Sequence, residues 1–375
     1  MKKLSLLLLA MSLLIASCGE RKQSATTDNS YEPLEVKYAK GFSLDQTDKY
    51  IRITIHNTFN QENEFQQRLY LVKSTEIETP SDGQKIVVPI KTLAIASVTN
   101  IGYLRLIDEL QSVKGACTPN LIYDSSLKSR FHSGEIKDLG DEFSPNIEGL
   151  LQLHPDAYMI PSYDGQDERL KYLKNAGVRF VFNNDWLEPT PLGRVEWIKF
   201  VAALYDKLPL ADSIFSAIEQ RYEANKLLVK DIKEENKPKV LMNTSFKGTW
   251  YMPAGNSYGG AFLKDAGANY VYKDKNIMQG ANLSYSFESV LAENHDADIW
   301  LNAYSSSKKE LLAMDERHGL FKAFKNGEVY SYKKSGDDYF ETGVIEPDVL
   351  LKDIIKTLYP TLLPDYETKY VEKCR

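Results

Sequence analysis

The sequence contains little cysteine or histidine, with 3 Cys and 5 His among 375 residues. So few thiol and imidazole groups argue against a disulfide scaffold and against a zinc cluster, and no two histidines share metal-ligand spacing. We therefore expect no metal site and no cofactor. The chain also lacks an excess of basic residues, because 46 Lys and Arg face 52 Asp and Glu, a formal net charge of −6. This balance argues against a nucleic-acid partner.

A long hydrophobic run is missing as well, and the apolar stretch Leu4–Ile15 is too short to span a membrane, which takes about 20 residues. It follows Lys2 and Lys3 and ends in Ile-Ala-Ser-Cys at Cys18, which resembles the lipobox of bacterial lipoproteins. We therefore expect 1–17 to be a signal peptide and Cys18 to carry a diacylglyceryl anchor. The mature chain would then be held at a membrane outside the cytoplasm. The alternative is an ordinary signal peptide with a chance cysteine.

The other two cysteines, Cys117 and Cys374, lie far apart in the sequence. An oxidising compartment permits a bridge between them, but sequence separation says nothing about distance. Our default expectation is that both are small buried apolar side chains.

Hydrophobic patterning divides the mature chain into segments. After a polar tether at 18–32, alternation of Ile51, Ile53 and Ile55 with polar residues predicts strands in a small β-rich extension at 33–90. Strands alternating with helices predict an α/β lobe with a mostly parallel sheet at 91–188, and the pattern returns at 238–375. The intervening segment 189–237 is helical throughout. We expect an α/β protein with two Rossmann-like lobes joined by a long rigid helix.

An internal repeat supports two similar lobes. Without gaps, 146–157 lies over 286–297, so that Glu148 matches Glu288 and Asp156–Ala157 match Asp296–Ala297. Each copy places a helix before a strand.

One motif suggests catalysis. Residues 255–259 match G-x-S-x-G, which would make Ser257 a hydrolase nucleophile. A triad would need a downstream histidine, and only His295 and His318 are available. We favour a serine that caps a helix instead. The carboxylates Asp337, Asp338 and Glu341 are expected to lie in a solvated loop.

Aromatic side chains gather near the ends of the predicted strands, where ligands of open α/β sheets bind. Flat rings with hydroxyl tips suit a large, partly apolar ligand. The candidate ligand-binding residues are Tyr103, Tyr123, Tyr163, Trp186, Trp250, Tyr258, Tyr304 and Tyr339.

Several segments together resemble a known family. These are KTLAIASVTNIGYLRLIDELQSVKGAC, NIEGLLQLHPDAYMI, MPAGNSYGGAFLKDAGANYV and SFESVLAENHDADIW. From Lys91 to Tyr359 the chain resembles the substrate-binding lipoproteins of ABC importers for iron–siderophores, haem and cobalamin.

That resemblance implies a monomer that is not an enzyme and that holds a metal chelate between its lobes, with Tyr123 and Tyr339 at the ligand. It also implies that Glu148 and Glu288 engage arginines of the ABC permease. A ferric siderophore is favoured, with cobalamin and haem as alternatives, and Arg130 and Arg179 are either solvated or grip an anionic ligand. Two other classes stay open, a lipid-anchored hydrolase using Ser257 and a surface protein that binds no small ligand.

Overall fold

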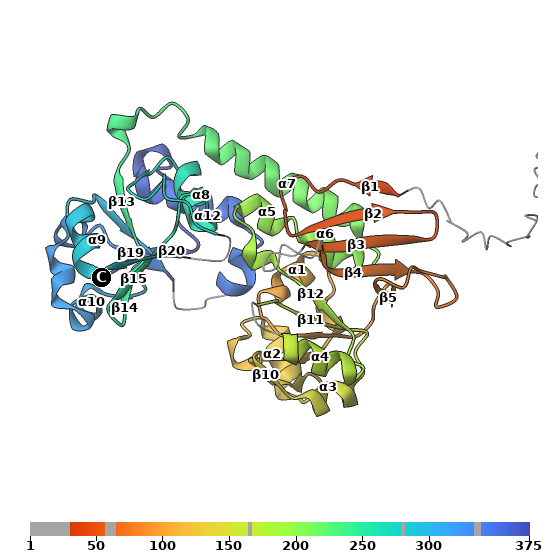
Figure 1. The fold of residues 1–375 in the computed structure, drawn as a ribbon. Helices are drawn as coiled ribbons and strands as arrows, with labels where there is room; N and C mark the ends of the chain where they lie inside the picture. Colours follow the sequence, from red (N-terminus) through yellow and green to blue (C-terminus); the bar gives the residue numbers. More distant parts are fainter. Residues whose placement is uncertain (1–30, 57–64, 164–166, 279–281, 334–338) are drawn as a thin grey trace, which may run out of the picture.

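The computed structural model describes residues 31–56, 65–163, 167–278, 282–333 and 339–375. The lipobox with Cys18 and the pair Asp337–Asp338 lie outside these residues. The protein has two α/β lobes joined by a long helix, with a β-sheet preceding the first lobe (Figure 1). The fold class expected from the sequence is confirmed. No helix among the described residues is long and apolar enough to cross a bilayer.

The N-terminal extension is a five-stranded sheet in the order β1-β2-β3-β4-β5. Its strands are β1 (Glu32–Leu34), β2 (Phe42–Gln46), β3 (Tyr50–His56), β4 (Phe65–Val72) and β5 (Gln84–Val87). The alternation noted in the sequence is that of β3, where Ile53 and Ile55 are buried.

Two buried carboxylates join this extension to the rest of the protein. Glu196 accepts hydrogen bonds from the backbone N–H groups of Lys37, Tyr38 and Ala39, at 2.6–2.9 Å. Glu188 accepts those of Lys40 and Gly41 at 2.8–3.0 Å. Because a buried carboxylate is stable only when its oxygens are hydrogen-bonded, these contacts make the extension part of the folded body.

The first lobe is a parallel sheet in the order β12-β11-β6-β7-β8. Its strands are β6 (Leu93–Ile95), β7 (Val113–Ala116), β8 (Lys137–Asp138), β11 (Ala157–Ile160) and β12 (Phe180–Phe182). Its helices are α1 (Asn100–Leu106), α2 (Ser125–His132), α3 (Ile147–Leu153) and α4 (Asp167–Asn175), and β9 (Gly140–Asp141) pairs with β10 (Ser144–Pro145). The order is that of a Rossmann-like sheet.

The connector contains three helices: α5 (Pro191–Val195), α6 (Ile198–Ala203) and α7 (Leu208–Leu227). Pro209 lies in the first turn of α7, where a missing N–H costs nothing. In Figure 1, α7 runs along the top of the molecule from the C-terminal lobe to the β1–β5 sheet.

The second lobe repeats the parallel core with fewer strands, in the order β16-β13-β18. The strands of this parallel sheet are β13 (Lys239–Met242), β16 (Asn269–Tyr270) and β18 (Ile299–Leu301). A second, antiparallel sheet contains β14 (Ser245–Phe246), β15 (Thr249–Met252) and β17 (Leu283–Ser286). A third sheet is the antiparallel pair β19 (Tyr330–Tyr332) and β20 (Val371–Lys373). Its helices are α8 (Tyr258–Asp265), α9 (Phe287–Asn294), α10 (Lys308–Met314), α11 (Lys322–Asn326) and α12 (Pro347–Leu358).

The structure corrects one end of the internal repeat. In the first lobe, Asp156 precedes β11 and accepts the Thr92 N–H at 2.9 Å. Its equivalent in the second lobe is Asp298, which precedes β18 and accepts the Lys239 N–H at 2.9 Å. The ungapped match to Asp296 is therefore wrong, because the second lobe has one more residue in the helix and one more between helix and strand.

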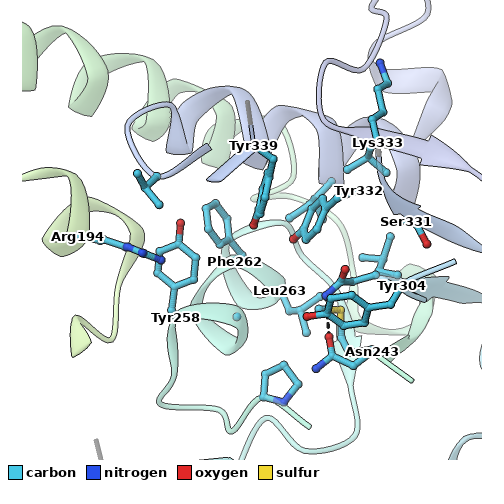
Figure 2. Close-up of a pocket in the computed structure, with 18 of the residues that line it drawn as sticks. Arg194, Asn243, Tyr258, Phe262, Leu263, Tyr304, Ser331, Tyr332, Lys333 and Tyr339 are labelled. Atoms are coloured by element: carbon cyan, nitrogen blue, oxygen red, sulfur yellow. Dashed lines mark hydrogen bonds between the residues drawn. The ribbon is translucent and has the colours of Figure 1, made fainter. Parts of the chain in front are cut away.

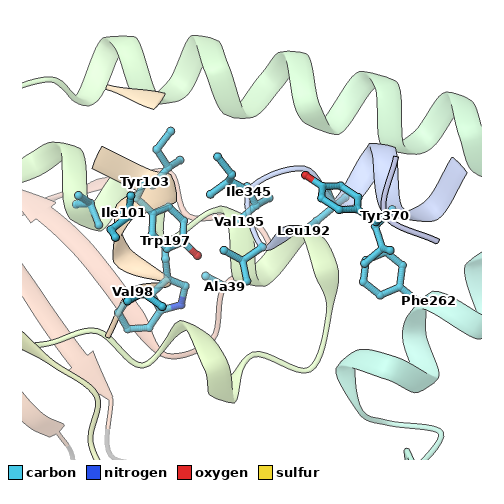
Figure 3. Close-up of a cluster of buried hydrophobic side chains, with 14 of the residues drawn as sticks. Ala39, Val98, Ile101, Tyr103, Leu192, Val195, Trp197, Phe262, Ile345 and Tyr370 are labelled. Atoms are coloured by element: carbon cyan, nitrogen blue, oxygen red, sulfur yellow. The ribbon is translucent and has the colours of Figure 1, made fainter. Parts of the chain in front are cut away.

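A continuous apolar core runs beneath α7 from the extension through the connector to the second lobe (Figure 3). Trp197 and Val195 of the connector lie there with Tyr103 of α1, and Ile345 of the second lobe reaches the same cluster. Cys117 and Cys374 are buried thiols in different lobes and are not bridged to each other. This agrees with the default expectation that both are small buried apolar side chains.

Candidate functional site

A cavity of about 520 Å³ opens between the lobes. Thr99 reaches it from the loop before α1, Arg194 from the connector, and Tyr258, Asn302 and Tyr339 from the second lobe. Three of the eight predicted aromatics line it, namely Tyr258, Tyr304 and Tyr339. The site lies beyond the carboxyl ends of β6, β13 and β18, as expected for an open α/β sheet.

Tyrosine rings form one wall of this cavity (Figure 2). Tyr332 and Tyr339 are stacked, with ring centroids 4.3 Å apart and planes inclined by 18°. Tyr258 meets Phe262 edge to face at 5.0 Å. Burial, with Tyr332 and Tyr258 nearby, raises the pKa of Tyr339 well above its usual value. The phenol is therefore neutral at neutral pH and presents a flat face and a hydroxyl tip to a ligand.

Arg194 and Lys333 are the cationic side chains among the described residues lining this cavity. Nε of Arg194 donates to Asp185 Oδ2 at 2.9 Å, and its guanidinium carbon lies 5.2 Å from the Tyr258 ring centroid. Burial is the largest single influence and lowers the pKa of Arg194, but Asp185, Tyr258 and Tyr103 together outweigh it and keep that pKa above its usual value. The pair brings little net charge to the ligand.

The hydroxyl group of Tyr103 contacts this ion pair. Its side chain is fully buried, and its hydroxyl contacts Asp185 Oδ2 at 3.1 Å and the Arg194 carbonyl at 2.8 Å. Tyr103 therefore orients the Arg194–Asp185 pair.

A second cavity, of about 670 Å³, lies on the other side of Tyr258. Trp186 and Pro189 of the first lobe and connector face Ser257 and Met278 of the second lobe. The Tyr163 ring lies between Trp186 and Phe143 with its plane tilted to both, at centroid distances of 5.5 and 5.3 Å. Nε1 of Trp186 is buried without a hydrogen-bond partner among the described residues.

Trp250 is not at the cleft, and its prediction as a ligand-binding residue is wrong. It lies on the inward face of β15, fully buried, and its Nε1 donates to the Met242 carbonyl at 2.8 Å. Its ring packs against Trp300, Phe287 and Phe321. Trp250 was expected near the end of a predicted strand, but it lies within β15, which forms a tight hairpin with β14.

Tyr123 lies at the edge of the first lobe with its ring 37% exposed and Lys128 Nζ 5.0 Å from the ring centroid. It lines neither cavity described above. Tyr304 lines the first cavity at its mouth, and its side chain is 57% exposed.

Ser257 is a helix cap, as favoured from the sequence. Its hydroxyl oxygen accepts the Gly260 N–H at 3.2 Å and donates to the Ala254 carbonyl at 2.7 Å. His318 is buried beside Trp250, with its Nδ1 at the Leu311 carbonyl, and His295 is at the end of α9. The hydroxyl is therefore not hydrogen-bonded to a base, as a serine nucleophile would be.

The charged residues named from the sequence have other roles. Arg130 is buried and donates to the carbonyls of Leu110, Gln111 and Val113, so it neither is solvated nor grips a ligand. Arg179 is exposed just before β12. The sequence patterns did not identify Arg194 as a cavity residue. Its only signal in the sequence is a single charge within the apolar run PLGRV.

Glu341 also differs from its expected solvated state, because it is fully buried. Its carboxylate accepts hydrogen bonds from the first lobe and does not lie in open solvent.

Glu148 and Glu288 are exposed on opposite lobes. Glu148 accepts a hydrogen bond from Gln152 at 3.2 Å, and Glu288 pairs with Arg317 at 2.5 Å. Among the described residues, no group of three or more His, Cys, Asp or Glu side chains is arranged to hold a metal ion.

Comparisons with known proteins agree with this geometry. The Periplasmic binding protein family matches residues 97–335, which is well over half of the chain. A lipoprotein of Methanocaldococcus jannaschii is 29% identical over 324 residues, covering 81% of this chain and 75% of that protein.

Two solved structures share the fold. Helicobacter pylori CeuE with Ni(II) bound gives a TM-score of 0.57 at 16% identity, covering 78% of this chain and 92% of that one. IsdE of S. aureus complexed with haem gives 0.53 at 19% identity, covering 72% and 98%. The chain belongs to the periplasmic binding protein family. As a member of this family it is a binding protein and not an enzyme.

Proposed function

We propose that this protein is a lipid-anchored importer component that captures a bulky metal chelate in the interlobe cleft and delivers it to the permease. A ferric siderophore is the favoured ligand, and cobalamin or haem are the alternatives. The protein would act as a monomer outside the cytoplasm, held at the membrane through Cys18.

The observation that carries the ligand class is the tyrosine wall beside a neutralised cation. Tyr258, Tyr332 and Tyr339 offer flat faces and neutral hydroxyls, Asp185 offsets the charge of Arg194, and Nζ of Lys333 donates to the Thr368 carbonyl. Such a lining suits a large ligand of low net charge that is partly aromatic or apolar.

The size of the cleft fits a large ligand. Two adjoining cavities of about 520 and 670 Å³ meet at Tyr258, Pro253 and Gly259. Each alone falls within the usual range for small-molecule pockets, roughly 300–1,000 Å³.

Relatives support a metal-containing cargo and a membrane anchor. One fold neighbour was solved with haem and another with Ni(II). A sequence relative bears the name lipoprotein.

The permease contact follows from the matched glutamates. An exposed carboxylate on each lobe suits charge-assisted pairs with arginines on two halves of a transporter. Glu148 and Glu288 have this placement.

Calorimetric titration of the purified full-length chain tests the ligand class. The probes are a ferric catecholate, a ferric hydroxamate, cyanocobalamin and haemin, each added separately. Saturable binding of one of them supports the proposal, and coloured protein as purified would support it further. Absence of binding to all four contradicts the ligand class.

A further inference from the structure

A segment of the second lobe crosses the cleft and is held by the first lobe. Between β19 and α12 the chain forms a π-helical turn, Tyr339–Gly343. Within it the Glu341 carboxylate accepts the backbone N–H of Tyr123, the N–H of Asp124 at 3.0 Å, and Nη2 of Arg105 at 3.0 Å.

All three partners are donors, and all belong to the first lobe. Asp124 is the N-cap of α2, and Arg105 lies in the last turn of α1. A carboxylate has only acceptors, so it satisfies every one of them, whereas an amide would turn its NH₂ group toward a donor. The side chain of Glu341 is fully buried, and a buried carboxylate with several charge-assisted bonds is a strong contact.

The backbone of this turn also lies close to α1 of the first lobe. A Cβ on Gly102 of α1 would lie 2.0 Å from the Glu341 carbonyl oxygen, so glycine is required for this approach. It would also lie 3.1 Å from Ile345 Cγ2, and Figure 3 shows Ile345 in the core beneath α7. The segment is therefore seated on α1 by both polar and apolar contacts.

The same turn carries a wall of the ligand cavity. Tyr339 stands two residues before Glu341, and its ring packs over Gly343 and stacks on Tyr332. The position of the tyrosine pair thus depends on the seating of this turn.

We propose that Glu341 is a positioning residue of the ligand cleft, whose contact with Tyr123 and Asp124 sets the separation of the lobes and the placement of Tyr339. The inference rests on the proposed function only in treating the Tyr332–Tyr339 pair as part of the binding site. Nothing in it requires Glu341 to touch the ligand.

Hydrogen–deuterium exchange on the full-length chain without ligand tests the contact. In Glu341→Ala, the Tyr123 and Asp124 amides lose their acceptor, and we expect their exchange to rise by about tenfold. Glu341→Gln keeps one carbonyl acceptor and should give an intermediate rate. Glu346→Gln is the matched control, because Glu346 accepts from Tyr370 and Lys369 within its own lobe. Gly102→Ala, which wedges the turn away with the carboxylate intact, should reproduce the faster exchange.

The second measurement is ligand affinity, for the ferric chelate that binds the wild-type protein. We expect Glu341→Ala to weaken it by about tenfold, while Glu346→Gln leaves it unchanged. Unchanged exchange at Tyr123 and Asp124 in Glu341→Ala, Glu341→Gln and Gly102→Ala would overturn the inference. If no probe binds the wild type, the proposed ligand class fails, and the exchange rates still decide whether the contact holds the lobes.

Discussion

Glu148 and Glu288 occupy the same position in their two lobes. Each is the second residue of a helix whose N-cap side chain, Asn146 or Ser286, accepts the N–H of the third residue. Each helix then leads to a strand preceded by an aspartate that accepts a backbone N–H of the neighbouring strand. The two carboxylates are therefore presented by equivalent units, as the proposed docking to a two-fold arrangement of permease subunits requires.

Reversing both charges tests the docking role. In the double variant Glu148→Lys and Glu288→Lys, we expect loss of transporter binding and uptake, because like charges then face the arginines proposed to receive these glutamates. Ligand affinity should not change, and the melting temperature should change little. The control reverses two other exposed glutamates, Glu76 and Glu367. Full uptake by the double variant would contradict the docking assignment.

Salt should weaken wild-type docking in the same assay. Exposed charge pairs are screened over about 8 Å at physiological ionic strength. Docking that is insensitive to added salt would point to an apolar contact instead. Measuring transporter affinity across a salt series decides this.

Tyr339→Ala should weaken chelate binding by about 1–3 kcal/mol, the scale of one large buried contact. The matched control is Tyr251→Ala, since Tyr251 is exposed on the outward face of β15. Calorimetry on both variants gives the comparison. Equal affinity of Tyr339→Ala and the wild type would remove Tyr339 from the site.

Cys18→Ser should abolish lipidation, because no other side chain at the cleavage site can take the diacylglyceryl group. We expect the variant to leave the membrane fraction, which cell fractionation and intact-mass analysis would show. A variant that is processed and partitions with membranes like the wild type would contradict the lipobox interpretation.

Part of the stability that the protein loses on acidification should come from Asp315. Hydrogen bonds from Arg317, which also pairs with Glu288, lower the pKa of Asp315 to about 2. A carboxyl pKa depressed in the folded state contributes stability above the unfolded value of about 3.9, and this contribution is lost as pH falls through about 2. The difference in unfolding free energy between wild type and Asp315→Asn should therefore shrink from pH 5 toward about pH 2. A constant difference across this range would contradict the shift.

The sequence was informative where a periodic pattern or a cap defined the local structure. Alternation identified β3, and Asn146 and Ser257 mark helix starts, because caps act within one turn. The sequence was not informative where contacts between residues distant in the sequence determine which side chains are buried. Trp250 is buried because β15 turns it inward, and Glu341 is buried because the first lobe supplies its donors. Trp250 packs against Phe321, 71 positions away, and Glu341 meets Tyr123 and Asp124, 218 and 217 positions away, so no local pattern records these contacts.

The tryptophan emission of the full-length chain tests the central claim most directly. Of the four tryptophans, Trp197, Trp250 and Trp300 are fully buried, while Trp186 is half-buried and lines the cleft. A bound ferric chelate should quench the emission saturably, and Trp186→Phe should remove most of that quenching while calorimetry still detects binding. Quenching that persists unchanged in Trp186→Phe would place the ligand outside the interlobe cleft and contradict the account.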